Sequence, residues 1–314
     1  MRLEQPLFTI ATITYNSKEW VSNAIESILA SSFTDFELLI SDDCSTDDTW
    51  RVIQQYQDHK IRAWRNESNI GEYPNRNKVL NEARGKYILY VDGDDILYKN
   101  TLRNLSEYIE FFPNAQMIWG VQPANVDFAI LPYLFESKQL LGLIYGTNLP
   151  FSIIGFSETL FRIEELKTVG GLSEKYAIGD TFIKKKLAVT CNALFVPIGF
   201  VFWRRSSNQA SQKVNNDYQN FLEGFLIDCE IMKDYKGDEK HTLKNGIIGS
   251  FYRRLIINTI LKGKLIDFIR LYNLSGLKYN DILHVFKKYK FKYRVVDNIE
   301  NPLVNKFNFK KEND

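Results

Sequence analysis

Cysteine and histidine are scarce in this chain of 314 residues, which holds three of each. The cysteines, Cys44, Cys191 and Cys229, are odd in number and far apart. This pattern excludes a disulfide framework and a four-cysteine zinc site, and it fits a reducing compartment. The histidines lack metal-ligand spacing and adjoin no candidate nucleophile, which argues against zinc hydrolase and Ser-His-Asp chemistry.

Long apolar runs and glycine-rich nucleotide motifs are also missing. No run approaches the roughly 20 apolar residues of a membrane-spanning helix, and the N-terminus lacks the apolar core and cleavage site of a signal peptide. We therefore expect a cytoplasmic protein, either soluble or peripheral on the inner face of the cell membrane. Neither G-x-x-x-x-G-K-[ST] nor a G-x-G-x-x-G after the first predicted strand occurs, which argues against P-loop and dinucleotide-binding proteins.

Positive and negative charges nearly balance over the whole chain, but they are distributed unevenly along it. The net charge of +2 gives no argument for a nucleic acid partner, and a composition of 45% hydrophobic residues suffices for a large core. By contrast, Phe251–Arg294 holds eleven Lys or Arg residues and two acids, Asp267 and Asp281. Apolar residues recur between these cations at near-helical intervals. Packed helices with a solvated basic face and contact with an anionic membrane surface both fit this pattern.

Strand and helix patterns alternate through the first 121 residues. Short apolar runs predict strands, and apolar residues at helical spacing predict the helices between them, over 21–29, 50–56, 75–84 and 101–111. The strands are predicted at Leu7–Ile13, Phe36–Ile40, Ile61–Trp64, Tyr87–Val91 and Gln116–Val121. This order predicts an α/β fold with a Rossmann-like, mostly parallel sheet flanked by helices. In such sheets, ligands bind at the carboxyl ends of the strands.

The remainder of the chain is less regular. Helices are predicted at Ser157–Leu166 and Asp180–Ala188, with a strand-like segment at Ala193–Arg204. From about residue 216 the pattern becomes helical, and we expect this C-terminal region to pack on the α/β core.

Acidic clusters follow two of the predicted strands. Asp92-Gly93-Asp94-Asp95 comes directly after Tyr87–Val91, and Asp42-Asp43-Cys44-Ser45 follows Phe36–Ile40. Proteins hold Mg²⁺ with one or two carboxylates plus substrate phosphates, and glycine lets the backbone approach a ligand closely. An acidic turn explains the first cluster equally well, and a helix cap at Ser45 explains the second.

Asp180 stands at the start of a predicted helix. The helix dipole favours an acidic residue there, so capping alone would account for it. An aspartate beyond the sheet could also deprotonate an acceptor hydroxyl.

These clusters, in this order, resemble glycosyltransferase family 2, the bacterial inverting sugar transferases of the GT-A fold. The similarity runs from about Pro6 to Val121 and more faintly to about Ser211. It rests on the ordered set of motifs rather than on any one of them: Thr14-Tyr15-Asn16, residues 41–47, Asn69-Ile70-Gly71, Arg76-Asn77, residues 83–88 and Asp92–Asp95.

The resemblance implies a nucleotide-sugar site at the strand ends. Thr14 and Tyr15 would line the nucleobase pocket, and Asp42 would hydrogen-bond the nucleobase. Arg76 would lie against the nucleotide. Asp92 would belong to the family's D-x-D pair and face the ribose.

The resemblance also implies a metal ligand and a base. Asp94, the second member of the D-x-D pair, would hold Mn²⁺ or Mg²⁺. Val169-Gly170-Gly171-Leu172 is similar to the segment before the family's catalytic acid, which points to Asp180 as the base. Many members have Glu-Asp where this chain has Gly179-Asp180. Members often place an Arg and then a His after the last core strand, whereas this chain has Arg204 and Arg205 without a His.

The implied activity is inverting transfer of a hexosyl or N-acetylhexosaminyl group from a nucleoside-diphosphate sugar, with UDP the commonest carrier in the family. The acceptor would be a glycan or a polyprenyl-linked glycan in bacterial surface-polysaccharide synthesis. Residues 1–125 would form the nucleotide-sugar-binding half, 126–215 the acceptor-binding half, and 216–314 the basic helical region.

Two other functions remain open. A sugar-1-phosphate nucleotidyltransferase also uses a parallel sheet with carboxylate-bound Mg²⁺, although a Gly-rich basic loop would be expected where this chain has Thr14-Tyr15-Asn16-Ser17. A non-catalytic sugar-nucleotide-binding relative is the other, and the joint presence of Asp42, Asp92, Asp94 and Asp180 counts against it.

Overall fold

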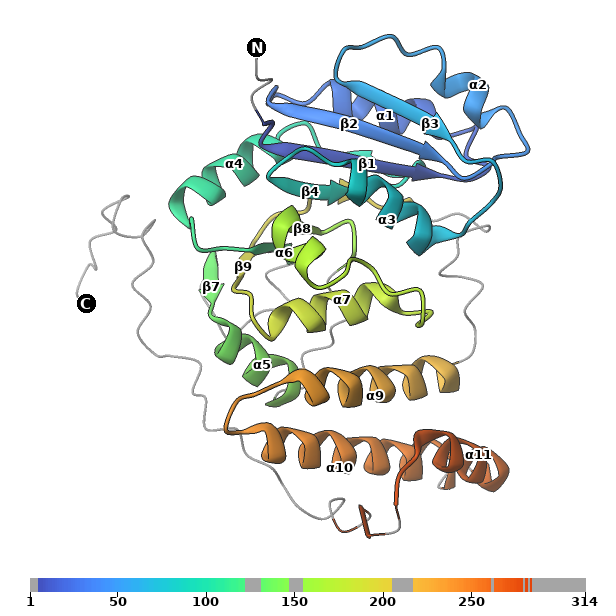
Figure 1. Cartoon of the computed structure of the whole chain (residues 1–314), viewed down its shortest axis with the longest axis vertical. Helices are drawn as coiled ribbons and strands as arrows, with labels where there is room; N and C mark the ends of the chain where they lie inside the picture. The colour runs from blue at the N-terminus through green and yellow to red at the C-terminus, as the bar shows by residue number, and fades with distance from the viewer. Residues whose placement is uncertain are drawn as a thin grey trace, which may run out of the picture.

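The computed structural model describes residues 5–121, 131–146, 155–204, 217–260, 263–278, 280, 281 and 283. The described residues up to 204 form an α/β part, and a stack of helices lies at the end of the molecule opposite to the first three strands (Figure 1). The expected division into a sheet-containing body and a helical C-terminal region is therefore present. The boundaries predicted near residues 125 and 215 fall outside the described residues.

One sheet of eight strands organises the α/β part, in the order β3-β2-β1-β4-β8-β6-β9-β7. Pairing is parallel for β3-β2-β1-β4 and for β6-β9, whereas β8 runs antiparallel to β4 and β6, and β7 antiparallel to β9. The mostly parallel sheet predicted from the sequence is confirmed. Its strands are β1 (Phe8–Thr14), β2 (Phe36–Asp42), β3 (Ile61–Arg65), β4 (Tyr87–Tyr90), β6 (Met117–Gly120), β7 (Tyr133–Phe135), β8 (Thr159–Arg162) and β9 (Ala193–Val196).

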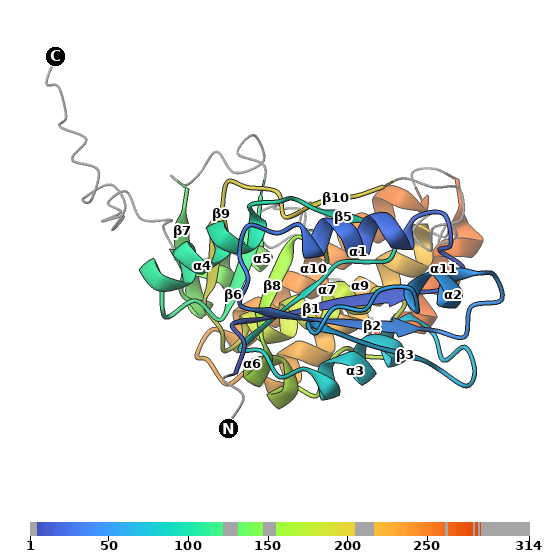
Figure 2. The same cartoon turned by 90° about the horizontal axis from the view of Figure 1, so that it is seen from above.

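Helices cover both faces of this sheet because alternate side chains of a strand point to opposite faces. Phe8 and Ile10 of β1 pack on one face with two helices, α1 (Val21–Leu29) and α4 (Thr101–Phe111). Ala11 packs on the other face with α3 (Glu72–Glu82), α6 (Ile163–Thr168) and α7 (Gly179–Ala188). The view from above shows α1 and α3 on opposite sides of the first strands (Figure 2).

The prediction of one helix over Ser157–Leu166 is wrong in its first half. Thr159–Arg162 forms strand β8, and helix α6 begins only at Ile163. Leu160 and Phe161 are fully buried between β4 and β6, and this tertiary packing outweighs the local spacing. The strand-like segment at 193–204 divides into β9 and β10 (Val201–Phe202), and β10 pairs antiparallel with β5 (Ile96–Leu97).

The C-terminal helices continue the core of the α/β part. Phe225 of α9 (Asp217–Asp234) stacks on Phe251 of α10 (Lys240–Asn258), with ring centroids 4.0 Å apart. Both rings belong to the apolar cluster that includes α7, and α11 (Leu265–Ser275) packs on α9 and α10. Two short helices, α2 (Thr49–Ile53) and α5 (Ser137–Gly146), complete the described part. Within it, no helix combines the length and apolarity needed to cross a membrane.

Candidate active site

The carboxyl ends of β1, β2 and β4 meet at one edge of the sheet, as the sequence predicts. Thr14 lies opposite Asp42 in the parallel register, and Gly93 N donates to Ile13 O at 3.1 Å. A Cβ atom on Gly93 would lie 2.6 Å from Thr14 Cγ2. Glycine is therefore required for the 92–95 loop to pass this close to Thr14.

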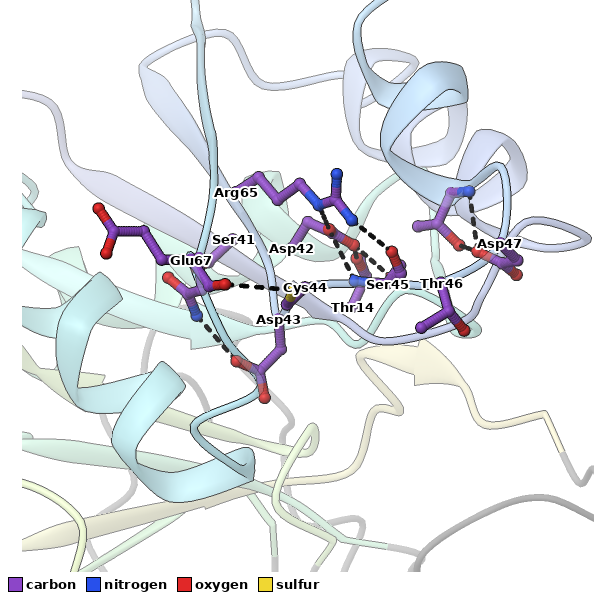
Figure 3. Close-up of polar contacts among 12 residues, drawn as sticks. Thr14, Ser41, Asp42, Asp43, Cys44, Ser45, Thr46, Asp47, Arg65 and Glu67 are labelled. Carbon is purple, nitrogen blue, oxygen red and sulfur yellow. Dashed lines mark hydrogen bonds and ion pairs between the residues drawn. The ribbon is translucent and has the colours of Figure 1, made fainter.

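Asp42 is fully buried and held by its neighbours (Figure 3). Thr14 Oγ1 donates to Asp42 Oδ1 at 3.1 Å, Ser45 donates to Asp42 through both its hydroxyl and its backbone N–H, and Arg65 Nε lies 3.4 Å from Asp42 Oδ2. The carboxylate thus ties the loop after β2 to the end of β1. The hydrogen bond from Asp42 to the nucleobase stays a prediction.

Ser45 does not cap a helix, contrary to expectation. Its hydroxyl donates to Asp42 and accepts from Asn16 N at 2.9 Å, and α2 begins only at Thr49. Asp47 Oδ1 accepts from Thr49 N at 2.9 Å instead. Ser45 therefore joins the loops after β1 and β2.

Asp43 fixes the turn before α3. Its Oδ1 accepts from Asn66 Nδ2 at 2.8 Å and from Ile70 N at 3.0 Å, and its Oδ2 accepts from Gly71 N at 2.9 Å. Gly71 has a φ of 91°, which favours glycine, and α3 begins at the next residue. The second acid of the Asp42-Asp43 pair thus positions the helix that carries Arg76.

The buried Arg76 forms an ion pair with Asp92, whose side chain is 32% exposed. Arg76 Nη2 lies 2.9 Å from both carboxylate oxygens of Asp92 and 3.1 Å from Glu72 Oε1, and its side chain is only 3% exposed. Its guanidinium also lies over the rings of Phe156 and Tyr90, at 4.7 and 5.2 Å from their centroids. Burial alone would lower the pKa of Arg76, but the charges of Asp92 and Glu72 raise it, so the side chain stays cationic.

Asp94 and Asp95 gather negative charge next to Asp92. Burial, followed by the charges of Asp92 and Asp94, raises the pKa of Asp95 to about 7. Arg204 closes over this cluster: its backbone N–H donates to Asp95 Oδ1 at 3.2 Å, its Nε donates to Asp94 O at 3.1 Å, and its guanidinium lies 3.9 Å from the centroid of the Trp20 ring. Arg204 thus reaches the D-x-D loop. Arg205 lies outside the described residues.

Asp180 stands in the first turn of α7, with about one-third of its side chain exposed. Lys184, one helical turn on, is fully buried, and its Nζ lies 3.6 Å from Asp180 Oδ2. Burial lowers the pKa of Lys184, and the charge of Asp180 acts against this by raising it. The sequence analysis missed this lysine, although the i, i+4 spacing of the two residues was visible.

Two residues of α3 hold the segment that leads to Asp180. Tyr73 Oη donates to Ala177 O and accepts from Gly179 N, both at 2.9 Å. A Cβ atom on Gly179 would lie 2.9 Å from the Tyr73 ring and 2.8 Å from Ser173 O. The glycine that stands where many family members have Glu is thus needed for the close approach of Tyr73.

Asn77, one turn after Tyr73, bonds the preceding turn. Its Nδ2 donates to Leu172 O and its Oδ1 accepts from Leu172 N, both at 2.8 Å. Gly171 has a φ of 73°, and a Cβ atom there would lie 2.6 Å from Asn77 Oδ1. Helix α3 therefore touches both sides of the site: Arg76 pairs with Asp92, while Tyr73 and Asn77 fix the segment before Asp180.

The predicted residues thus form two groups. The first group lies together at the carboxyl edge of the sheet and consists of Thr14, Asp42, Arg76, Asp92 and Asp94. The second is Asp180, whose preceding segment is bonded to Tyr73 of the helix that also carries Arg76. Tyr15 is 48% exposed at this edge, where a planar ligand could contact its ring.

The family resemblance is confirmed by comparison with known proteins. Residues 9–159 match the family model described as Glycosyl transferase family 2. The putative teichuronic acid biosynthesis glycosyltransferase TuaG of Bacillus subtilis is 36% identical over 107 residues, which cover 33% of this chain and 42% of TuaG. Poly(ribitol-phosphate) beta-N-acetylglucosaminyltransferase TarS of Staphylococcus aureus is 33% identical over 107 residues, which cover 33% of this chain and 19% of TarS. The matches therefore span less than half of these curated relatives.

Solved structures confirm the fold. S. aureus TarS in complex with UDP-GlcNAc superposes with a TM-score of 0.64 at 22% identity, covering 88% of this chain and 81% of that one. The mannosyltransferase PcManGT of Pyrobaculum calidifontis, in complex with GDP-Man and Mn²⁺, gives a TM-score of 0.58 at 15% identity, covering 90% and 79%. The GT-A type α/β fold expected from the sequence is the fold of this chain.

Proposed function

Because residues 9–159 of this chain belong to glycosyltransferase family 2, we propose that the protein transfers a sugar, with inversion, from a nucleoside-diphosphate sugar to a glycan or lipid-linked glycan acceptor. The observation that carries this proposal is the carboxyl edge of the sheet, where Arg76 pairs with Asp92 and where the exposed Tyr15 follows β1. The segment before Asp180 is bonded to Tyr73, on the same helix as Arg76.

UDP is the proposed carrier and surface-polysaccharide synthesis the proposed context. TarS was solved with UDP-GlcNAc. WfaP of Escherichia coli, 34% identical over 104 residues, is named as a UDP-Glc:alpha-D-GlcNAc-diphosphoundecaprenol beta-1,3-glucosyltransferase. The polar strand ends and the aromatic ring of Tyr15 provide hydrogen-bonding and stacking groups of the kind that a nucleotide needs.

A divalent cation is proposed at Asp94. In the described ranges, no group of three or more His, Cys, Asp or Glu side chains is arranged as a metal site. The residues present still fit Mn²⁺ or Mg²⁺, because such a cation needs only one or two carboxylates when substrate phosphates complete its shell. The charges of Asp92 and Asp94 add to burial in raising the pKa of Asp95. A cation held here would stabilise charge on the departing diphosphate.

The chain's own residues would divide the remaining work. Asp92, fixed by Arg76, would accept hydrogen bonds from the ribose. Asp180 would take the proton of the acceptor hydroxyl as that oxygen attacks the anomeric carbon on the face opposite to the diphosphate. The bond from the anomeric carbon to the diphosphate breaks as the new glycosidic bond forms, which inverts the configuration.

A donor screen tests the proposal. The full chain is incubated with UDP-, GDP- and dTDP-sugars, with Mn²⁺ or with chelator, and the released nucleotide is measured with and without candidate acceptors. Release of UDP that requires metal and rises with acceptor supports a transferase. Release of pyrophosphate from UTP and a sugar 1-phosphate would support the nucleotidyltransferase, and tight donor binding without any turnover would support a non-catalytic relative.

A further inference from the structure

The far end of the molecule exposes aliphatic side chains in an unusual concentration. Twelve large hydrophobic residues of the described part are exposed, and seven of them lie between positions 257 and 283. The seven are Ile257, Ile260, Leu265, Ile266, Ile269, Leu274 and Leu283. Single exposed apolar residues need no explanation, but such a cluster marks an interaction surface.

Helix α11 separates its apolar residues onto two faces. Leu271 is buried, and Phe268 and Tyr272 pack against the core, with Tyr272 beside Tyr252 of α10. On the opposite face, Ile266 is 83% exposed and Ile269 is 52% exposed. Folding therefore uses one side of α11 and leaves aliphatic side chains on the other.

Exposed cations lie in the same stretch of the chain as these aliphatic residues. Arg253, Arg254, Lys264, Arg270 and Lys278 are all exposed. The two acids of this stretch, Asp267 and Asp281, are only partly exposed. The stretch from 251 to 283 thus carries six Lys or Arg residues against two acids in the sequence, whereas the whole chain is almost neutral.

We propose that the exposed face of α11, with the adjoining end of α10, docks on an anionic lipid surface. Aliphatic side chains would enter the boundary between headgroups and acyl chains, and the flanking cations would pair with acidic headgroups. The combination of exposed aliphatic and basic side chains in this stretch favours a lipid surface over a second copy of the chain, since two copies would bring like charges together. Each cation that reaches the surface strengthens binding about fivefold.

The surface lies away from the candidate active site. Helix α11 and the end of α10 lie at the bottom of Figure 1, at the end opposite to β1–β3. The proposal does not depend on the transferase assignment, because vesicle binding is measured without donor or acceptor.

The test uses sedimentation of the full chain with sucrose-loaded vesicles, either of phosphatidylcholine alone or of phosphatidylcholine with phosphatidylglycerol. The wild type is expected to bind the anionic vesicles at low salt and to lose binding in about 1 M salt, where the Debye length falls to about 3 Å. The double substitution Ile266→Asp/Ile269→Asp should weaken binding at least about tenfold. Both side chains are exposed, so folding should be kept, and circular dichroism checks this.

A matched control carries the same added charge elsewhere. Gln54→Asp/Gln55→Asp also adds two negative charges at exposed positions, but at the end of α2, at the opposite end of the molecule. It should bind vesicles like the wild type. Equal loss in both variants, equal binding to neutral vesicles, or a dimer that dissociates in Ile266→Asp/Ile269→Asp while vesicle binding stays unchanged would overturn the proposal.

Discussion

The donor side and the base side of the candidate site are built differently. On the donor side, Asp42, Asp43 and Asp92 are held by partners on adjoining strand ends and on α3, and Asp42 is fully buried. On the base side, Asp180 is about one-third exposed, and its segment is fixed by Tyr73, which bonds residues more than a hundred positions away in the chain. Asp42 and Asp43 are thus part of the folded core, and Asp92, itself 32% exposed, is held by the buried Arg76, whereas the segment before Asp180 is attached through Tyr73. Substitutions on the donor side and on the base side should therefore have different effects.

Asp94→Asn is expected to have the largest effect. It removes a negative ligand from the proposed cation, so metal-dependent release of nucleotide should fall by about 10³-fold or more. The measurement is turnover with Mn²⁺ in the folded variant. Asp48→Asn, at a side chain that is 64% exposed, is the control and should keep full activity. A near wild-type rate for Asp94→Asn would remove Asp94 from the metal site.

Asp180→Asn tests the separation most directly. Transfer to acceptor should fall by about 10²–10⁴-fold because the general base is lost. The Kd for the nucleotide, measured by calorimetry, should stay at the wild-type value, since Asp180 lies on the base side. If nucleotide binding and transfer were lost together, Asp180 would instead have a structural role such as capping α7.

Arg76→Met, in contrast to Asp180→Asn, should lower the stability of the folded protein. It leaves Asp92, which is 32% exposed, without its buried partner, and we expect this to cost about 1–3 kcal/mol of unfolding free energy. Urea denaturation measures this, and nucleotide binding should weaken in parallel. The control is Arg51→Met, because Arg51 is 79% exposed and pairs with Asp48 at 3.8 Å. Its effect should stay within about 0.5 kcal/mol.

Tyr73→Phe should disturb the base side alone. The ring remains, but the bonds to Ala177 O and from Gly179 N are lost, which costs about 1–2 kcal/mol of stability in total. We expect kcat to fall about tenfold from misplacement of Asp180, with nucleotide binding unchanged. Tyr56→Phe, which loses one exposed bond to Glu26, is the control and should leave kcat unaltered. Weaker nucleotide binding in Tyr73→Phe would show that the two sides are not separable.

The same difference explains what the sequence could predict. Strands β1, β2 and β4 are short runs rich in apolar and β-branched or aromatic residues and are followed by polar residues, so the donor-side edge was visible in local sequence. The helix over Ser157–Leu166 was wrong because the four residues of β8 are strand only through their neighbours β4 and β6. Strands β5 and β10, of two residues each, carry too short a signal to find.

The contacts that set the base side have no local signal. Tyr73 and Asn77 lie in a helix whose sequence shows nothing of their partners near residues 172–179. Gly179 looked like a departure from the family pattern, and the positions of Ser173 O and the Tyr73 ring give it a reason. The motifs therefore predicted which residues come together at the site. The side chains that orient them could be identified only from the tertiary structure.

Glu158 connects the residues just before β8 to the β10 segment, and its substitution should give the smallest effect, one that depends on pH. Its Oε2 accepts from Phe200 N at 2.7 Å and its Oε1 from Val201 N at 3.4 Å, in the segment that leads to Arg204. Burial raises the pKa of Glu158 from 4.5 to about 7, against these two hydrogen bonds. Between those values the folded protein keeps a proton that the unfolded chain has lost, so the free energy of unfolding falls as the pH rises through this window.

Glu158→Gln should remove that fall, because an amide does not titrate and its oxygen can still accept from Phe200 N. The limiting slope for one proton is about 1.4 kcal/mol per pH unit. Since Glu158 is partly exposed, we expect a total difference of about 1 kcal/mol between the two proteins across the window. Urea denaturation at several pH values measures it, and Glu107→Gln, at an exposed position on α4, should reproduce the wild-type slope. Parallel curves for wild type and Glu158→Gln would mean that Glu158 is ionised in the folded protein throughout, and the segment before Arg204 would then be anchored by charge at every pH.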